Sequence, residues 1–287
     1  MQIVIRSIET IAEVRRVEAL QREVWAMPDE RDVVPAHVLV TAQKNGGLLL
    51  GAFDGETLAG FVFGFVGRTA RGQFKHCSHM LGVLVPYRGQ GIGELLKARQ
   101  REFVIAQGLD LVTWTYDPLE SANASLNIGR LGAVCNTYLR NVYGNLDDKL
   151  NTGLPTDRFQ VDWWLHSSRV SARLEGGHLP PVHYTGDLPP DTGEFVNRVQ
   201  VNASGYPEPG SWERRHGSRV LVEIPANFQR LKAHSVQLAG EWRSVTRAIF
   251  EAYFGDGYHV VDFLRVGDGD RRRCFYALDP ISDRPWG

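Results

Sequence analysis

The chain has 287 residues, 43% of them hydrophobic and 23% charged, and a formal net charge of −1 at pH 7. This length suits one large domain or two smaller ones, and the near-zero charge argues against a general nucleic-acid or membrane-surface binder. The sequence contains no apolar run of transmembrane length. Its three cysteines, Cys77, Cys135 and Cys274, form no C-x-x-C pair, so we expect a cytoplasmic protein without a disulfide framework or a metal site.

The first half of the chain predicts alternating strands and helices. Residues 2–8 alternate as a strand, and a helix follows from about Ser7 or Glu9 with apolar positions as far as Val24. Asp54-Gly55 separates two apolar runs, 48–53 and 58–66, and predicts a β-hairpin. The remaining elements expected in this half are strands over 74–85, 109–116, 133–143 and 158–166 and helices over 91–107 and 121–131.

A glycine-rich turn joins the strand over 74–85 to the helix over 91–107. Glycine lets a backbone adopt positive φ and approach a ligand closely, and the first N–H groups of a helix lack intrahelical partners. Arg88 is expected to add a fixed positive charge at the mouth of the turn. The pattern therefore predicts a phosphate cradle. Its expected ligand-binding residues are Val85, Arg88, Gly89, Gln90, Gly91, Ile92 and Gly93.

The spacing of these glycines narrows the ligand. The turn has neither the G-x-G-x-x-G of a dinucleotide fold nor the Gly-Lys-Ser/Thr of a P-loop. Instead, Arg88-x-x-Gly91-x-Gly93 resembles the pyrophosphate-binding signature of the GNAT acyltransferase superfamily, (Gln/Arg)-x-x-Gly-x-(Gly/Ala). The resemblance covers about residues 1–166 and includes the order of strands and helices. It implies an α/β fold with a mixed sheet, and acetyl-CoA or another acyl-CoA such as succinyl-CoA as the cofactor. The central parallel strands of such a fold splay beside the turn and admit the pantetheine arm.

The resemblance also implies where the reaction would occur. In the family, a backbone N–H on the strand before the turn polarises the thioester oxygen, which implies Leu84 or its neighbours. Relatives often place a glutamate base on that strand, but this chain offers His76 and His79 instead, and histidine titrates near neutrality. The two positions should face opposite sides of a regular strand, with His79 on the face of Leu81 and Val83. The alternative for each histidine is a partly buried strand residue satisfied by a neighbour.

Two further roles follow from the resemblance. Family members often carry a tyrosine acid shortly before a Leu-Gly pair, but Ile128 or a neighbour occupies that place before Leu131-Gly132. The remaining candidates for the acid are Tyr138 and Tyr143, with Tyr116 at the end of the preceding strand, and a packing role is the alternative for each. Asn123 stands where relatives bind the pantetheine arm or a water, and capping of a helix is its alternative.

The second half of the chain has a different character. Glycine and proline pairs at 176–177, 180–181 and 189–190 predict a long irregular linker over 167–217. A strand over 219–224, a helix over 229–254 and strands over 258–266 and 273–278 then predict a smaller β-α-β-β lobe. We therefore expect an acyl-CoA-binding domain at 1–166 and a C-terminal lobe at 218–287. The lobe is interpreted as a degenerate GNAT-like half without a cradle of its own.

These observations predict an N-acyltransferase. It would move an acetyl group, or another short acyl group such as succinyl, from acyl-CoA to the primary amine of a small molecule or amino acid by direct attack. A catalytically silent CoA-binding or sensing module and a protein N-acetyltransferase are the alternatives. The expected partner is a small-molecule amine, with no nucleic acid, no membrane and no metal, and a homodimer is compatible with the sequence.

Overall fold

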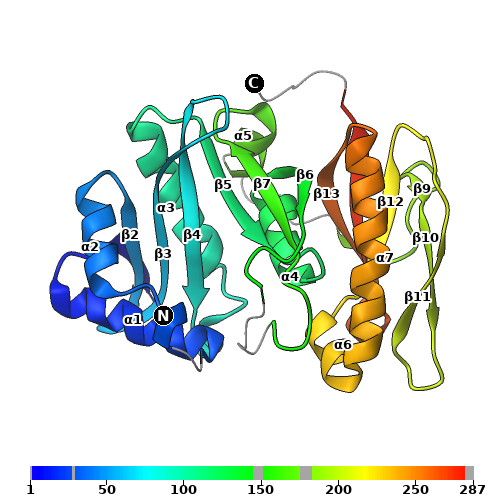
Figure 1. The fold of residues 1–287 in the computed structure, drawn as a ribbon, viewed down its shortest axis with the longest axis horizontal. Coiled ribbons are helices and arrows are strands. Elements are labelled where there is room, and N and C mark those ends of the chain that lie inside the picture. Colours follow the sequence, from blue (N-terminus) through cyan, green and yellow to red (C-terminus); the bar gives the residue numbers. More distant parts are fainter. Residues whose placement is uncertain (1, 28–29, 145–150, 175–182, 282–287) are drawn as a thin grey trace. The chain divides into compact units, whose positions relative to one another are not determined.

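The computed structural model describes residues 2–27, 30–144, 151–174 and 183–281. The glycine pair at 176–177 and the proline pair at 180–181, on which the linker prediction partly rests, lie outside these residues. The chain divides into two compact units, residues 1–114 with 146–152 and residues 115–145 with 153–287 (Figure 1). We expected the boundary near residue 166, whereas residues 115–144 and 153–166 belong to the second unit.

The first unit follows the predicted order of elements, with one addition. Its strands are β1 (Ile3–Ser7), β2 (Leu48–Asp54), β3 (Thr57–Arg68), β4 (Phe74–Val83) and the first part of β5 (Leu111–Tyr116). Its helices are α1 (Ile11–Trp25), α2 (Ala36–Lys44) and α3 (Ile92–Ala106), with short 3-10 turns η1 (Glu30–Asp32) and η2 (Val85–Tyr87). Helix α2 is not among the predicted elements.

Local signals explain several of these boundaries. Thr10 caps α1 and accepts the N–H of Glu13, whose carboxylate accepts the N–H of Thr10 in return. The predicted hairpin is confirmed, since Asp54 pairs with Thr57 and Gly55 adopts a φ of +56°. The sheet order is β1-β2-β3-β4-β5, antiparallel except for β4 and β5, which are parallel. The mixed α/β class predicted from sequence is therefore confirmed.

Helices cover both faces of this sheet (Figure 1). On one face, α1 and α2 contribute Val14, Val17, Leu20 and Leu39 to a buried cluster with Phe61 and Phe63 of β3. On the other face, Ile92 and Leu96 of α3 pack with Val62 and other strand residues. Because the sheet is covered on both sides, β2 and β3 are apolar at almost every position.

Strand β4 contains an irregularity that sequence parity does not reveal. Met80 pairs with Phe63 and Ser78 pairs with Gly64, so His79 is an extra residue on β4 relative to β3. Such a β-bulge interrupts the alternation of side chains and bends the strand. As a result, even-numbered residues such as Ser78 face α3 before the bulge, whereas odd-numbered residues such as Leu81 face it afterwards.

The second unit contains a second sheet region and a long helix. Its strands after β5 are β6 (Val134–Leu139), β7 (Arg158–Trp164), β8 (His183–Tyr184), β9 (Glu194–Phe195), β10 (Asn197–Val201), β11 (Pro207–Trp212), β12 (Val220–Ile224), β13 (Tyr258–Val266) and β14 (Arg273–Pro280). Its helices are α4 (Ser121–Ala124), the π-helix η3 (Ser125–Arg130), α5 (Ser168–Leu174), α6 (Phe228–His234) and α7 (Val236–Gly255), with a 3-10 turn η4 (Gly269–Arg271).

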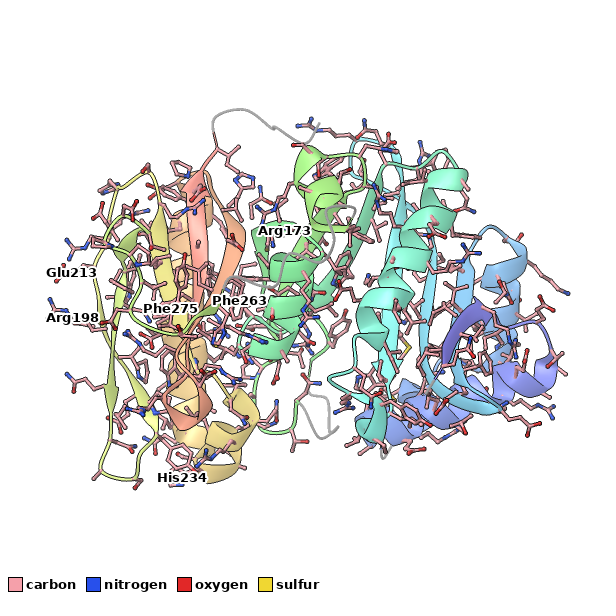
Figure 2. All side chains as sticks on the ribbon, turned by 180° about the vertical axis from the view of Figure 1, so that it is seen from behind. Arg173, Arg198, Glu213, His234, Phe263 and Phe275 are labelled. Carbon is pink, nitrogen blue, oxygen red and sulfur yellow. The ribbon has the colours of Figure 1, made fainter. Side chains whose placement is uncertain are left out.

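The strand order β7-β6-β13-β14-β12-β9 joins the expected C-terminal lobe to the strands before it. Phe263 and Phe275 point to opposite faces of this sheet. Phe263 contacts Tyr276, whereas Phe275 packs in a separate cluster with Leu264 (Figure 2). The core of this unit therefore draws on segments from both sides of the predicted linker.

Two predictions for this half need correction. The segment 167–217 is not wholly irregular, because its described part holds α5 and the antiparallel pair β10 and β11. The helix predicted over 229–254 is two helices, since Ser235 has an extended backbone and caps α7 by accepting the N–H of Leu238.

Candidate functional site

The glycine-rich turn before α3 has the geometry of an anion cradle. Gly89 and Gly91 have φ of +77° and +78°, in the left-handed region that favours glycine. Gly91 is the N-cap of α3, and its carbonyl accepts the N–H groups of Glu94 and Leu95. Within the described chain, the N–H groups of residues 89–93 donate to no other backbone group outside regular elements. The turn thus presents donors at the positive end of the helix dipole.

There is room for a ligand at this turn. A Cβ placed on Gly89 or Gly91 would meet no atom within 4 Å. The side chain of Ile92 is buried in the core, so only its backbone can serve a ligand. Gln90 is exposed and donates from Nε2 to the carbonyl of Pro86 at 3.1 Å, which stiffens the turn.

Arg88 does not carry its charge where we expected it. Its Nε donates to the carbonyl of Val83 at 3.0 Å and its Nη2 to the carbonyl of Val24 at 3.3 Å. The guanidinium therefore ties the turn to the end of β4 and to α1. Arg88 still adds a positive field, but the structure favours a positioning role for its side chain over direct charge at the mouth.

Leu84 also differs from expectation. Its N–H donates to the carbonyl of Ala59 on β3 at 2.9 Å, so this group is already engaged. Backbone groups alternate in an antiparallel ladder, which turns the N–H groups of Leu81 and Val83 toward the other edge of β4. The bond from Arg88 to the Val83 carbonyl agrees with that direction. Val85 begins the 3-10 turn η2, and its side chain is 67% exposed.

The other edge of β4 faces β5 for only a short distance. The parallel ladder joins His76 to Val112 and Cys77 to Thr113 and has no further pair in the described residues. The strands therefore part before β4 reaches the glycine turn, as the resemblance implied. The backbone edge at Leu81 and Val83 lies beyond the last ladder pair, on the way to the turn.

His79 occupies the bulge itself. Its ring contacts Phe63 and Phe65 with centroids 5.9 Å away in both cases, and Phe63 belongs to the α1 and α2 face. His79 keeps an exposed surface, while the two phenyl rings desolvate its ring and lower its pKa. It is therefore neutral at neutral pH and able to accept a proton.

The prediction that His79 shares a face with Leu81 and Val83 is wrong. Leu81 and Val83 pack in the α3 cluster, whereas His79 contacts the cluster on the opposite face. The extra residue reverses the parity that we counted along a regular strand. The prediction that His76 and His79 face opposite sides holds, because no bulge separates His76 from Ser78 on the α3 face.

His76 is fully buried under α3. Its Nε2 lies 3.1 Å from Gln100 Nε2, its ring contacts Phe103, and its Nδ1 has no hydrogen-bond partner among the described residues. Burial and then the nearby charge of Lys97 lower its pKa to about 4. A Cβ at position 64 would lie 2.2 Å from His76 Nε2, so glycine is required there. These contacts favour the structural alternative for His76.

Tyr138 lies in the second unit, in a polar network. Its hydroxyl donates to Asp157 at 2.7 Å, and the same buried carboxylate accepts Arg247 Nε at 2.7 Å and the N–H of Asn141. Burial and this bond to a carboxylate raise the pKa of Tyr138. Its proton is thus held by Asp157, and a role as general acid stays a prediction.

Tyr143 and Asn123 belong to the second unit as well. Tyr143 is 48% exposed, and its hydroxyl lies 2.8 Å from Thr115 Oγ1. Asn123 is exposed within α4, whose N-cap is Glu120, so Asn123 does not cap this helix. Both positions leave their side chains accessible to a ligand, and their proposed roles stay predictions.

One polar group of this region escaped the sequence analysis. Lys97 of α3 is 2% exposed, and its ammonium donates to Ser78 Oγ at 2.9 Å and to Gln100 Oε1 at 3.1 Å. It also lies 3.5 Å from the centroid of the Trp114 ring. A lysine within an amphipathic helix is normally read as part of a solvated face, so no local signal marks its burial.

Two kinds of feature are absent from the described residues. No group of three or more His, Cys, Asp or Glu side chains is arranged to hold a metal ion there. None of the helices described combines the length and apolar character needed to cross a membrane.

Comparisons with known proteins give structural matches only. No protein-family model matches the chain, and no curated protein matches it. The structure is similar to the ribosomal-protein-S18-alanine N-acetyltransferase of Escherichia coli, with 16% identity over 57% of this chain and 94% of that chain and a TM-score of 0.46. It is also similar to a GNAT-family acetyltransferase of Streptococcus pneumoniae, with 18% identity over 56% of this chain and 98% of that chain and a TM-score of 0.45. Arabidopsis thaliana NAA60 in complex with acetyl-CoA matches with 17% identity over 57% of this chain and 99% of that chain, at a TM-score of 0.45.

Proposed function

We propose that this protein is an acyl-CoA-dependent N-acyltransferase that acts on the primary amine of a small molecule or amino acid. The observation that carries the proposal is the arrangement of β4 and α3 in the first unit. A left-handed glycine turn opens α3, and its N–H groups donate to no described backbone group outside regular elements; β4 has no described ladder pair with β5 after Cys77. A pyrophosphate and a linear arm are the ligand features that such an arrangement suits.

The residues of this unit have distinct roles in the proposal. An acyl-CoA supplies the reactive thioester when bound. The N–H groups of residues 89–93 bind the pyrophosphate, and Arg88 holds the turn in shape through Val83 and Val24. The N–H groups of Leu81 and Val83 are the donors that would polarise the thioester oxygen, since they face the open edge of β4.

His79 is the proposed general base. It is exposed at the bulge, and its lowered pKa keeps it neutral at neutral pH. In the reaction, an amine nitrogen bonds to the acyl carbon while the carbon–sulfur bond breaks, and the amine proton passes to His79 directly or through water. A thiolate is a stable leaving group, so this scheme does not require a tyrosine acid.

A catalytically silent CoA-binding module is the second candidate. The observation that favours it is the engagement of Tyr138 with Asp157, together with the lack of a glutamate on β4. A thiol-release assay with acetyl-CoA and succinyl-CoA, each against amino acids, simple amines and an N-terminal peptide, separates the candidates. Release with a small amine supports the proposal. CoA binding without release supports the silent module, and release with the peptide alone indicates a protein N-acetyltransferase.

A further inference from the structure

The two strands that frame the proposed acyl arm part at a defined register. On the α3 face, His76 of β4 pairs with Val112 of β5. One step of two residues further along both strands, the next side chains on this face are Ser78 and Trp114. A continued parallel ladder would make Ser78 and Trp114 neighbours, but the described ladder ends after Cys77 and Thr113.

The side chain of Lys97 lies between those two residues. Its Nζ is 2.9 Å from Ser78 Oγ and 3.5 Å from the centroid of the Trp114 ring. Gln100, one turn along α3, accepts from the same nitrogen at 3.1 Å. The amine therefore contacts α3, β4 and β5 at the point where the ladder stops.

The two contacts of Gln100 fix the orientation of its side-chain amide. Because an amine that donates to Gln100 Oε1 leaves the amide nitrogen facing His76, Gln100 Nε2 donates to His76 Nε2 at 3.1 Å. His76 is thereby assigned the tautomer with the proton on Nδ1. The chain Lys97–Gln100–His76 is buried throughout, so it has few alternative arrangements.

We propose that Lys97 is a positioning residue that holds β4 and β5 apart and so sets the width of the passage for the acyl arm. The identity of the arm as an acyl-CoA rests on the proposed function. The separation of the strands by Lys97 is independent of that function. The amine donates to Ser78 and Gln100 whether or not it is protonated, so the wedge does not depend on its charge.

The chain offers a matched control. Lys75, which lies on β4 itself, is a second lysine that contacts β5, through a 2.9 Å bond from its Nζ to Thr113 Oγ1. It does so on the opposite face and where the ladder is intact. Replacing Lys75 by Met removes a comparable bridge without touching the point of separation.

The first measurement needs no ligand. Amide exchange along β4, resolved by NMR, is compared in the wild type, Lys97→Met and Lys75→Met. A Met side chain can fold away from the strands, so Lys97→Met should extend the ladder and protect β4 amides after Cys77, while Lys75→Met should not. Exchange that stays unchanged in Lys97→Met overturns the wedge. Met is close to Lys in length and volume, so Lys97→Met should fold, and Ser78→Ala provides a milder second variant expected to shift exchange in the same direction.

The second measurement uses two probes, acetyl-CoA and adenosine 3′-phosphate 5′-diphosphate, which lacks the pantetheine arm. Lys97→Met should lose about tenfold in affinity for acetyl-CoA, because the passage is no longer preorganised, and keep its affinity for the nucleotide. Lys75→Met should retain both affinities. Equal loss of both probes, or no loss of either, overturns the role of Lys97 in binding the arm. A wild-type protein that binds neither probe refutes the proposed function, and the exchange measurement then still decides the wedge.

Discussion

Gly91 gives the sharpest test of the proposed cofactor site. It has a φ of +78° and a ψ of 1°, caps α3, and has open space where a Cβ would stand. Replacing it by Glu places a side chain and a negative charge beside the N–H groups that are proposed to bind pyrophosphate. Because the open space imposes no clash, the variant should fold, and the anion should be excluded by steric blockade and repulsion.

Two free energies of opposite kind are involved. A non-glycine residue in the left-handed region costs about 1–2 kcal/mol, which lowers the free energy of unfolding in Gly91→Glu. A ligand at a concentration of 100 times its Kd stabilises the folded state by about 2.7 kcal/mol. In a protein of this size that amounts to a rise in Tm of roughly 5–10 °C. The variant should therefore melt a few degrees lower than the wild type and show none of the rise with acetyl-CoA.

The assay is thermal unfolding with and without acetyl-CoA, together with calorimetric titration of the same ligand. Gly91→Ala carries the backbone strain without the bulk or charge, and should keep most of the rise in Tm. Gly108→Glu is a second control, since Gly108 has a φ of +72° and open space at the far end of α3. It should lower the Tm by a similar amount and leave the ligand-induced rise intact.

The reasoning would be refuted if Gly91→Glu bound acetyl-CoA as tightly as the wild type. It would also fail if Gly108→Glu lost the ligand-induced rise, because strain anywhere along α3 would then explain the effect. Loss of the rise in Gly91→Ala together with Gly91→Glu would show that backbone conformation, and not blockade of the turn, governs binding.

Three further predictions address the histidines and the division of the chain. His79→Ala should lower kcat roughly a hundredfold, with little change in acetyl-CoA affinity. It should also remove the limb of the pH–rate profile that rises with pH below 6.5. An unchanged limb would exclude His79 as the base. The free energy of unfolding of the wild type should fall by about 1.6 kcal/mol between pH 6.5 and pH 5. His76 has a pKa of about 4 when folded and 6.5 when unfolded, so protons favour the unfolded chain in this window. Denaturant unfolding of His76→Gln should lack this part of the pH dependence. If the variant keeps the full pH dependence, a titrating group other than His76 causes it. A fragment ending at His166 should be insoluble, because it exposes Phe159, whose ring packs against Phe250, Phe254 and Tyr276; a soluble, folded fragment would contradict the observed division into units.

The sequence by itself determined the features that depend on neighbouring residues along the chain. Asp54-Gly55 specified a hairpin because glycine tolerates the positive φ of that turn, and the hairpin formed with Asp54 opposite Thr57. The spacing of Gly89 and Gly91 specified a left-handed turn at the start of α3 for the same reason. These are local properties of the backbone, so short-range chemistry suffices to predict them.

Tertiary structure decided the features that depend on which surfaces meet. The bulge at His79 follows from the register of β4 against β3, and it reversed the face expected for this histidine. The direction of the Arg88 side chain follows from the carbonyls of Val83 and Val24, the second of which lies far away in sequence.

The same holds for burial and for the division into units. Lys97 has the sequence context of a solvated helix residue, yet packing of α3 on β4 and β5 buries it beside Ser78 and Trp114. Residues 115–166 were expected to complete the first domain, but β6 pairs with β13, more than a hundred residues later. Strand pairing and burial are set by contacts between distant segments, and a pattern read along one segment carries no information about its partner.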